Sequence, residues 1–501
     1  MAALRAELSE TKSELSTQQA MTEVATARVH ELEQSLGLIL RGQTGPTSQR
    51  YVPSEQAMLP FVPADISVPP RPPQAEDTES PGEETSAPAK RRGKPKRRKR
   101  ASLDPLESRK VRCTASDEVC AKCGEALVVI GQTESFRVNC QPGDFFVEDV
   151  VRDKCACAAC PDQGALTVPG PYALDRALCG NALLARVVVD KYADHLPLHR
   201  QAKRMSREGF DVATNTLAGW VKATGELLSP VAEAVRSELL ATPFLQGDDT
   251  GMPVQDAGNG RLRKGRLWAF TDQQQVFYAL TPTKEGVEPV ALLDGFAGDL
   301  LVVDGGSEFN AVVRKQDLVR GGCGSPLRKR FFEARHAHPA EAHIALQTIR
   351  DLFLIERHLW GRPPDFIRAH RQQASKPIVD SFFAWFSGVS TVARPESLLG
   401  KALNYAVRQK DTLTAHLSHG EIPMHNNLSE LMLRQAVVGR KNWLFGRSEV
   451  GAKVAATLYT LVGSCMLQGI DPHDDFVDIL GRVQNHTAKQ FTPSAWAQSH
   501  P

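Results

Sequence analysis

The sequence of 501 residues contains no stretch of about eighteen consecutive apolar residues, which is the length that a membrane-spanning helix needs. Its first residues also lack the apolar core of a secretory signal peptide. Cysteine is scarce as well, because ten cysteines are too few for a disulfide scaffold in a chain of this length. These absences exclude an integral membrane protein and a secreted disulfide-rich protein. We therefore expect a soluble, cytoplasmic protein without a membrane partner.

The composition of most of the chain is that of a globular protein, with 42% hydrophobic and 24% charged residues, and its length allows two or three domains. Residues 1–41 differ, because they follow a seven-residue repeat typical of a coiled-coil helix. We expect this helix to pair in a homo-oligomer, although a lone amphipathic helix on the next domain would show the same pattern. The two heptad positions hold Leu8, Leu15, Thr22, Val29 and Leu36, and Leu4, Thr11, Gln18, Ala25, Leu32 and Ile39.

Residues 42–100 are rich in Pro, Ser, Glu and Gln without periodicity, which predicts a disordered linker. The linker ends in a dense basic run, so the net charge of +2 for the whole chain says little. Such a run releases counterions when it binds a polyphosphate, which favours DNA binding, and a solvated tail is the alternative. The run contains no aromatic residues, which argues against stacking on a single strand. The candidate DNA-binding residues are Lys90, Arg91, Arg92, Lys94, Lys96, Arg97, Arg98, Lys99 and Arg100.

Residues 101–168 contain two CxxC pairs, a spacing that presents two thiolates to one tetrahedral ion. The pairs are Cys120 with Cys123 and Cys157 with Cys160, and four thiolates form a structural Zn²⁺ site. Redox chemistry is the alternative, and Cys155 could compete as a ligand. Short β segments between the pairs predict a zinc-ribbon-like domain, with strands at 126–130, 135–138 and 145–151. We expect ordinary buried thiols at Cys113, Cys140, Cys179, Cys323 and Cys465.

Residues 169–240 have helical patterns. The segments 198–208 and 214–223 are separated by a short break around Gly209, a spacing typical of a helix-turn-helix. Such a pair can bind DNA, and plain helix packing is the alternative. The candidate contacts are Asn215, Lys222 and Thr224.

Two aspartates are expected on neighbouring strands. Residues 244–254 predict a strand that holds Asp248 and Asp249, and an apolar strand that begins at residue 299 delivers Asp304 at its carboxyl end. Between them lie predicted strands at 266–271 and 275–281 and a predicted helix at 287–296. This order would place Asp248 and Asp304 on adjacent central strands, although either residue could belong to a turn instead.

A third carboxylate, Glu430, lies on an amphipathic helix that starts at paired asparagines. The spacing from Asn427 to Glu430 is also that of a capping box, in which Glu430 only bonds back to the amide of Asn427. We expect the helix to end at a basic turn, residues 439–442, where Arg440 and Lys441 would hold phosphate near Glu430. Trp443 could stack on a displaced base or pack in the core.

Three converging carboxylates would repel one another and raise one another's pKa values. Divalent cations remove this conflict. Two Mg²⁺ ions about 4 Å apart can activate an attacking oxygen and stabilise a leaving oxygen in phosphoryl transfer.

Residues from about 90 to 483 resemble the transposase of the IS66 group of bacterial insertion sequences. The matching motifs are the two CxxC pairs, residues 191–202, Asp248-Asp249-Thr250, and Asp304-Gly305 followed by Phe309-Asn310. The longest motif is Asn-Asn-x-x-Glu followed by Gly-Arg-Lys-Asn-Trp-Leu-Phe, which matches residues 426–445. The chain departs from the usual pattern of this family at His425, where an Asp is usual, and at Leu431, where an Arg is usual.

The resemblance implies a multidomain α/β protein with an RNase H-like catalytic domain formed by residues 241–322 and 423–460. It implies a helical insertion at residues 323–422, and residues 461–501 would be a C-terminal helical element. Asp248, Asp304 and Glu430 would then be the catalytic DDE triad that binds Mg²⁺ or Mn²⁺.

The implied activity is that of a DNA transposase, which cleaves the 3′ ends of a transposon and joins them to target DNA. Its partners would be double-stranded DNA, both the transposon ends and the target, and accessory proteins of the same element. It would act in the bacterial cytoplasm, in association with the nucleoid. One alternative is a catalytically decayed, zinc-dependent DNA-binding protein. Another is a metal-dependent repair nuclease of the same fold.

Overall fold

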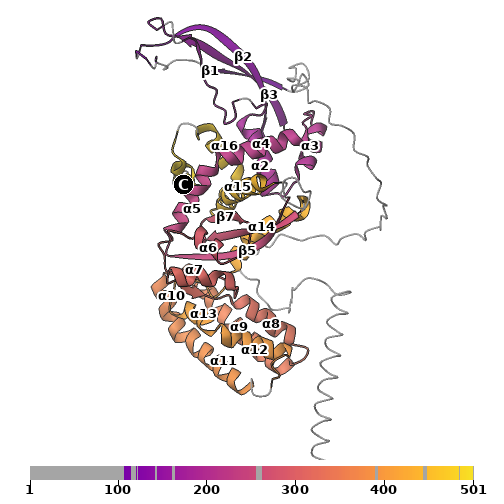
Figure 1. Cartoon of the computed structure of the whole chain (residues 1–501), viewed down its shortest axis with the longest axis vertical. Helices are drawn as coiled ribbons and strands as arrows, with labels where there is room; N and C mark the ends of the chain where they lie inside the picture. Colours follow the sequence, from indigo (N-terminus) through magenta and orange to yellow (C-terminus); the bar gives the residue numbers. More distant parts are fainter. Residues whose placement is uncertain are drawn as a thin grey trace, which may run out of the picture. The chain divides into compact units, whose positions relative to one another are not determined.

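The computed structural model describes residues 107–499, apart from residues 114–119, 121, 124, 142–143, 161–163, 176, 256–261, 390–392, 444–447 and 484–485. The expected coiled-coil helix, the linker and its basic run lie outside the described residues. The described part is a mixed α/β structure with two sheets, and each sheet combines parallel and antiparallel strand pairs (Figure 1).

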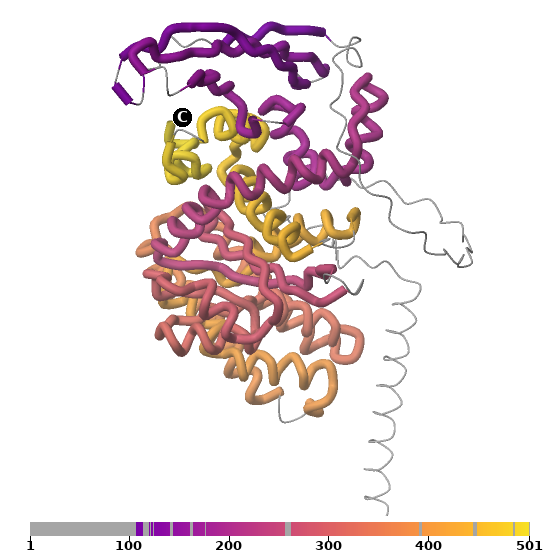
Figure 2. The backbone as a smooth tube through the Cα atoms, turned by 45° about the horizontal axis from the view of Figure 1, so that its top comes forward, coloured from indigo at the N-terminus to yellow at the C-terminus, as the bar shows by residue number. Residues whose placement is uncertain are grey.

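The first sheet is built on a long antiparallel hairpin of β2 (Val128–Gln141) and β3 (Asp144–Ala156) (Figure 2). Strand β1 (Glu107–Cys113) pairs with β3 in parallel, and the short β4 (Leu166–Thr167) also pairs with β3. The sequence predicted two separate strands at 126–130 and 135–138, which was wrong. They form one strand, because β3 pairs with β2 along its whole length. The pairing continues past a bulge-like register shift between Val129 and Gly131 of β2.

Four helices follow the first sheet: α2 (Asn181–Tyr192), α3 (Leu198–Arg207), α4 (Thr214–Leu227) and α5 (Ser229–Leu240). Helices α3 and α4 occupy the two segments expected of a helix-turn-helix. Thr224 is fully buried and its hydroxyl donates to the carbonyl of Trp220, so its side chain is not available to DNA. Asn215 and Lys222 are exposed on the same helix.

The second sheet has the strand order β7-β6-β5-β8-β9. Strands β5 (Phe244–Gln255), β6 (Leu262–Thr271) and β7 (Val276–Thr281) are antiparallel neighbours. Strands β8 (Leu300–Val302) and β9 (Val319–Gly321) join the other side in parallel. The connecting elements are α6 (Val287–Leu292), the 3₁₀ turn η3 (Ser307–Phe309) and α7 (Asn310–Lys315). The predicted order of three strands, a helix and a further strand is confirmed.

Two long helices pack on this sheet, α14 (Asn427–Trp443) on β5 and β6, and α15 (Glu449–Leu467) on β7. Strand β7 is an edge strand, and α15 supplies hydrogen-bond partners for it. The amides of Val276 and Tyr278 donate to the hydroxyls of Ser464 and Thr460, at 3.0 and 2.9 Å. These bonds satisfy backbone groups that would otherwise form an unpaired edge.

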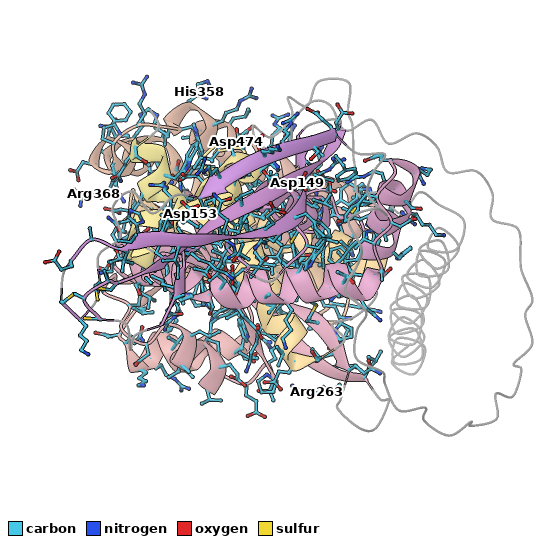
Figure 3. The ribbon with its side chains drawn as sticks, turned by 90° about the horizontal axis from the view of Figure 1, so that it is seen from above. Asp149, Asp153, Arg263, His358, Arg368 and Asp474 are labelled. Atoms are coloured by element: carbon cyan, nitrogen blue, oxygen red, sulfur yellow. The ribbon has the colours of Figure 1, made fainter. Side chains whose placement is uncertain are left out.

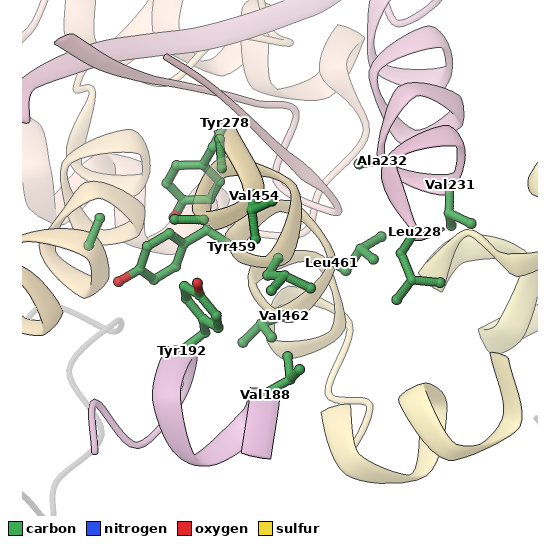
Figure 4. Packing of buried hydrophobic residues seen from close by; sticks show 14 of the residues in the cluster. Val188, Tyr192, Leu228, Val231, Ala232, Tyr278, Val454, Tyr459, Leu461 and Val462 are labelled. Carbon is green, nitrogen blue, oxygen red and sulfur yellow. The ribbon is translucent and has the colours of Figure 1, made fainter. Parts of the chain in front are cut away.

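Helix α15 is the one helix of the described part that is long and apolar enough to cross a membrane, and 67% of its most apolar window is buried inside the protein. Its apolar side chains pack with those of α2, α5 and β7 in the main core (Figure 4). Three tyrosines, Tyr192, Tyr278 and Tyr459, meet there with ring centroids 4.9 and 5.6 Å from Tyr459. At the start of α15, Glu449 forms a 2.7 Å ion pair with Arg263 of β6. Arg263 is labelled in Figure 3.

A helical segment separates β9 from α14 and has its own apolar core around Phe331, Phe382 and Phe386. Its helices are α8 (Gly324–Ala334), α9 (Pro339–Leu359), α10 (Pro364–His370), a π-helical turn η4 (Arg371–Ser375), α11 (Lys376–Val389), α12 (Leu398–Arg408), α13 (Lys410–Thr414) and the 3₁₀ turn η5 (Ala415–Leu417). After α15 come α16 (Pro472–Arg482), η6 (Ala488–Phe491) and α17 (Pro493–Ser499).

Candidate functional site

Asp248 and Asp304 lie level with each other on neighbouring parallel strands. The register between β5 and β8 pairs Phe244 with Leu300 and Gln246 with Val302. Asp248 is two residues beyond Gln246, and Asp304 is two residues beyond Val302, so both carboxylates stand just past the last paired position. Asp248 lies within β5 and is therefore not in a turn. The side chain of Asp304 does accept a turn-like bond, from the amide of Gly306 at 2.9 Å.

Glu430 reaches the same region because the start of α14 is fixed to β5. Asn426, which is fully buried, donates its side-chain amide to the carbonyl of Gly247 at 2.8 Å, one residue before Asp248. The other end of this amide, Oδ1, accepts a 2.6 Å bond from the hydroxyl of Ser429. The carbonyl of Asn426 accepts the amide of Glu430 at 3.3 Å. One buried side chain therefore connects the strand of Asp248 to the helical turn of Glu430.

The electrostatics show that the three carboxylates lie within range of one another. The pKa of Asp248 is raised to about 7, mainly by burial; the hydrogen bond from the Asp249 amide opposes the rise, and the charges of Asp304 and Glu430 contribute to it. The pKa of Glu430 is also raised, by partial desolvation of its carboxyl group and then by the charge of Asp304. Asp248 and Asp304 are half-buried and Glu430 is exposed, so solvent reaches the group. An added cation would relieve the repulsion.

A second charged network lies beside the carboxylates. The side chain of Asp249, 2% exposed, forms ion pairs with Arg266 of β6 and with Lys284, whose Nζ lies 3.3 Å away. Lys284 also contacts the buried Glu308, at 2.8 Å. Asp249 follows Asp248 directly and Glu308 lies shortly after Asp304. The shared lysine therefore ties together the two chain segments that carry the aspartates. This role could not be predicted from the sequence, because Lys284 belongs to no motif.

Two further cations face the site. Arg320, at the end of β9, donates to the carbonyls of Asp304 and Gly306 and to the side chain of Asn310, so its guanidinium holds the turn after Asp304. Arg434 lies one helical turn after Glu430 and its charge lowers the pKa of that carboxyl. Arg434 has no ion-pair partner within the described residues.

The structure contradicts one alternative and one expectation for α14. The amide of Asn427 donates to Nδ1 of His425 at 3.3 Å rather than to Glu430, so no capping box forms. The helix does not break at residues 439–442 but continues to Trp443. Gly439 is buried against the ring of Trp443, and a Cβ added there would lie 2.5 Å from the Tyr459 hydroxyl. This glycine therefore allows close packing and does not form a turn.

Because α14 continues, Arg440 and Lys441 lie about 15 Å along the helix from Glu430. Both side chains still reach solvent, since Arg440 is half-buried and Lys441 is exposed. Trp443 packs with the core, and the ammonium of Lys191 lies 3.8 Å from the centroid of its ring. Of the two alternatives for Trp443, core packing is therefore the one observed.

The four cysteines of the two CxxC pairs gather at the open end of the β2–β3 hairpin. Cys120 and Cys123 precede β2, Cys157 follows β3 directly, and the pair Val128–Ala156 closes the ladder beside them. All four Sγ atoms lie within 4.8 Å of one another, as four ligands of one tetrahedral ion must. Backbone amides of Cys123 and Lys122 lower the pKa of Cys120 to about 6, whereas a side-chain hydrogen bond with Cys123 raises that of Cys160 to about 12. The cluster could bind zinc.

Cys155, the expected competitor, is fully buried within β3 and does not belong to the cluster. Among the described residues, the four cysteines are the one group of three or more possible ligands with this spacing. The three carboxylates interact electrostatically at wider separation. The other cysteines are buried, apart from the half-buried Cys113.

Comparison with known proteins identifies the family of the chain. The model of the family described as Transposase IS66 family matches residues 176–454, which include Asp248, Asp304 and Glu430. The chain belongs to the IS66 family of transposases. It is therefore a transposase or a protein derived from one, and membership implies that it binds DNA. The match with its relatives in Sinorhizobium fredii (strain NBRC 101917 / NGR234) extends over most of the length of each relative.

Two of these IS66 relatives are the uncharacterized proteins y4hP and y4jD. The first is 28% identical over 412 residues, which cover 76% of this chain and 74% of that protein. The second is 27% identical over 381 residues, which cover 73% of this chain and 74% of that protein.

Proposed function

We propose that this IS66 family member is a DDE transposase with an RNase H-like catalytic core and that Asp248, Asp304 and Glu430 are its catalytic carboxylates. The observation that carries the proposal is the mutual electrostatic influence of these three groups, which come from β5, the end of β8 and α14. The strand order β7-β6-β5-β8-β9, with Asp248 on the central strand, supports the same core.

The donor set fits Mg²⁺ or Mn²⁺, because hard divalent cations prefer carboxylate oxygen. The pKa of Asp248 is raised mainly by burial, and the charges of Asp304 and Glu430 contribute to the rise. When bound, such cations lower the pKa of an attacking water and stabilise a leaving oxygen. The residues that hold them would be Asp248, Asp304 and Glu430. Asn426 and Lys284 would fix the backbone segments from which these carboxylates project.

The proposed reaction has two steps without a covalent protein intermediate. In the first, water attacks a phosphodiester at a transposon end, the bond from phosphorus to the 3′ oxygen breaks, and a 3′-OH is freed. In the second, this hydroxyl attacks a target phosphodiester, a new phosphorus–oxygen bond forms, and the 3′ oxygen of the target strand leaves. The half-exposed site suits both steps, because each attacking group arrives on DNA or from solvent.

The other parts of the chain would recognise and hold DNA. The cysteine cluster would bind structural Zn²⁺ in a zinc-ribbon-like domain, and this domain with helices α3 and α4 would recognise the transposon ends. Arg440 and Lys441 would contact phosphates farther along the duplex than expected from sequence, since they lie about three turns of α14 beyond Glu430. Residues 90–100 would bind DNA without sequence specificity. The N-terminal helix would hold two transposon ends together by pairing with a second copy.

The test is cleavage of labelled end DNA by purified protein in Mg²⁺, with products scored as nicks and joined strands. Asp304→Asn should abolish both products while end binding stays nearly unchanged, because the proposed DNA-binding residues lie in other segments. Asp299→Asn is the matched control, since Asp299 is exposed at the opposite end of β8. Equal loss of binding and cleavage in Asp304→Asn would contradict the assignment. Zinc-dependent binding by the unsubstituted protein without any nick would leave a DNA-binding protein derived from a transposase.

A further inference from the structure

The helical segment between β9 and α14 places an aromatic side chain against the backbone next to Asp304. Tyr405 of α12 lies so close to Gly305 that a methyl group added there would be 3.3 Å from both Cε2 and Oη of the tyrosine. The hydroxyl of Tyr405 therefore stands beside the residue that follows Asp304. Its ring packs on the apolar core of the helical segment.

An arginine from a second helix of the segment covers Tyr405. The guanidinium carbon of Arg330, on α8, lies 4.4 Å from the centroid of the tyrosine ring. Arg330 is exposed, and no acidic residue in the described part of the chain forms an ion pair with it. This contrasts with Arg320 nearby, whose donors are used on protein carbonyls and on Asn310. Arg330 thus lies over the Tyr405 ring, and its N–H donors make no hydrogen bond or ion pair within the described residues.

A phosphodiester oxygen is the ligand that fits these groups. A guanidinium presents its N–H donors in a planar fork that matches the oxygens of a phosphate. The hydroxyl of Tyr405 is protonated at neutral pH, as a phenol is, and can donate a hydrogen bond to the same phosphate. A stacked base fits less well, because Arg330 covers one face of the ring and the remainder packs on the segment's own core. What is left is the polar edge, which faces the turn after Asp304.

We propose that Arg330 and Tyr405 form a phosphate-binding subsite beside Asp304, through which the helical segment holds the DNA strand that is cut. This inference rests on the proposed function, since it takes the carboxylates as the place where DNA is cleaved. It gives the segment a direct role in substrate binding in addition to its packing.

The test uses a synthetic duplex of the terminal repeat that flanks the gene, with single phosphates around the cleavage position replaced by neutral methylphosphonates. Affinity is measured in Ca²⁺, which takes the same oxygen ligands, and cleavage is measured in Mg²⁺. For the unsubstituted protein, one or two replacements should weaken binding by roughly 10- to 100-fold, the loss expected for one charge-assisted hydrogen-bonded contact. In Arg330→Ala the same replacements should cause no further loss, and Tyr405→Phe should show an intermediate pattern.

The matched control is Arg335→Ala. Arg335 caps the same helix and also stacks on a ring, but on that of Phe332, 3.6 Å from its centroid. Its phosphate profile should equal that of the unsubstituted protein. If Arg330→Ala proves unstable, Arg330→Lys keeps the charge, and it should recover part of the affinity at the same phosphates.

Three outcomes would overturn the subsite: an unchanged phosphate profile in Arg330→Ala, no dependence on any phosphate near the cleavage position, or a defect removed by an abasic nucleotide, which would indicate base stacking. Failure of the proposed function looks different. In that case the unsubstituted protein binds the duplex and shows a phosphate profile but makes no nick in Mg²⁺.

Discussion

The side-chain amide of Asn426 donates a 2.8 Å hydrogen bond to the carbonyl of Gly247, and this bond joins the helix of Glu430 to the strand of Asp248. Asn426→Ala should remove it and deprive the Gly247 carbonyl of this donor, while the Ser429 hydroxyl keeps its 3.0 Å bond to the backbone carbonyl of residue 426. We expect the free energy of unfolding to fall by about 1–3 kcal/mol, the cost of an unsatisfied buried polar group. The midpoint of urea unfolding gives the measurement.

The same substitution should reduce Mg²⁺-dependent cleavage more than end binding, because it loosens the spacing of two carboxylates and leaves the proposed DNA-recognition segments intact. Asn442→Ala is the control for losing an asparagine bond on α14, since Asn442 is exposed and donates to the carbonyl of His195 at 2.9 Å. An effect of Asn426→Ala on stability and cleavage no larger than that of Asn442→Ala would contradict the positioning role.

Two glycines in helices should respond to alanine in opposite directions. An added Cβ at Gly439 would collide with the ring of Trp443 and lie 2.5 Å from the Tyr459 hydroxyl, whereas one at Gly219 in α4 meets nothing within 4 Å. Gly439→Ala should therefore lower stability by about 1–3 kcal/mol through overpacking, despite the better helix propensity of alanine. Gly219→Ala should raise stability by about 0.5–1 kcal/mol. Thermal unfolding of the two variants side by side decides, and a stabilised Gly439→Ala would show that this contact relaxes freely.

Removal of zinc should affect the hairpin and leave the second sheet unchanged. The cysteine cluster forms a small core of its own, separate from the main core that holds the carboxylate-bearing strands. A strong chelator should release one zinc per chain and speed amide exchange at the cysteine end of β2 and β3, with exchange in β5 and β6 unaltered. Cys157→Ser should abolish the zinc content, and Cys155→Ser should retain it, because Cys155 lies outside the cluster. Equal zinc loss in both serine variants would refute the ligand set.

The elements around the carboxylates were predictable because their signals are local. Apolar runs bounded by turns gave β5, β6, β7 and β8 in the right order, and that order predicted Asp248 and Asp304 on adjacent strands. The register that brings them level was not predicted. The cysteine cluster was predictable for a similar reason, since each CxxC pair already fixes two ligands.

The contacts that bring distant segments together were not predictable. The bond from Asn426 to Gly247 and the approach of Tyr405 to Gly305 join residues with no periodic relationship in the sequence. Gly439 was predicted to lie in a turn, because a glycine next to basic residues is found both at helix ends and at close contacts. Only the packing of Trp443 and Tyr459 around Gly439 distinguishes the two.

A buried histidine should make the helical segment sensitive to acid. His416 in η5 is 4% exposed, and its Nδ1 lies 2.9 Å from the carbonyl of Leu413. The guanidinium of Arg371 donates through Nη1 to the backbone carbonyl of His416, and Glu356 pairs with Nε and Nη2 of the same guanidinium. Burial, and then the charge of Arg371, lower the pKa of His416 to about 3. Burial also lowers the pKa of the neighbouring His425, to about 4.

The sign follows from the two states of His416. Between pH 6.5 and 3 the unfolded chain binds a proton there that the folded chain excludes, so stability is present above the unfolded pKa and is lost as pH falls below it. The loss between pH 6.5 and 4 should be roughly 3 kcal/mol for a fully buried ring. Urea unfolding from pH 8 to 4 should therefore show a flatter pH dependence for His416→Gln than for the unsubstituted protein. His343→Gln, at an exposed position of α9, should leave the slope unchanged, and identical slopes for both variants would mean that His416 accepts a proton in the folded state.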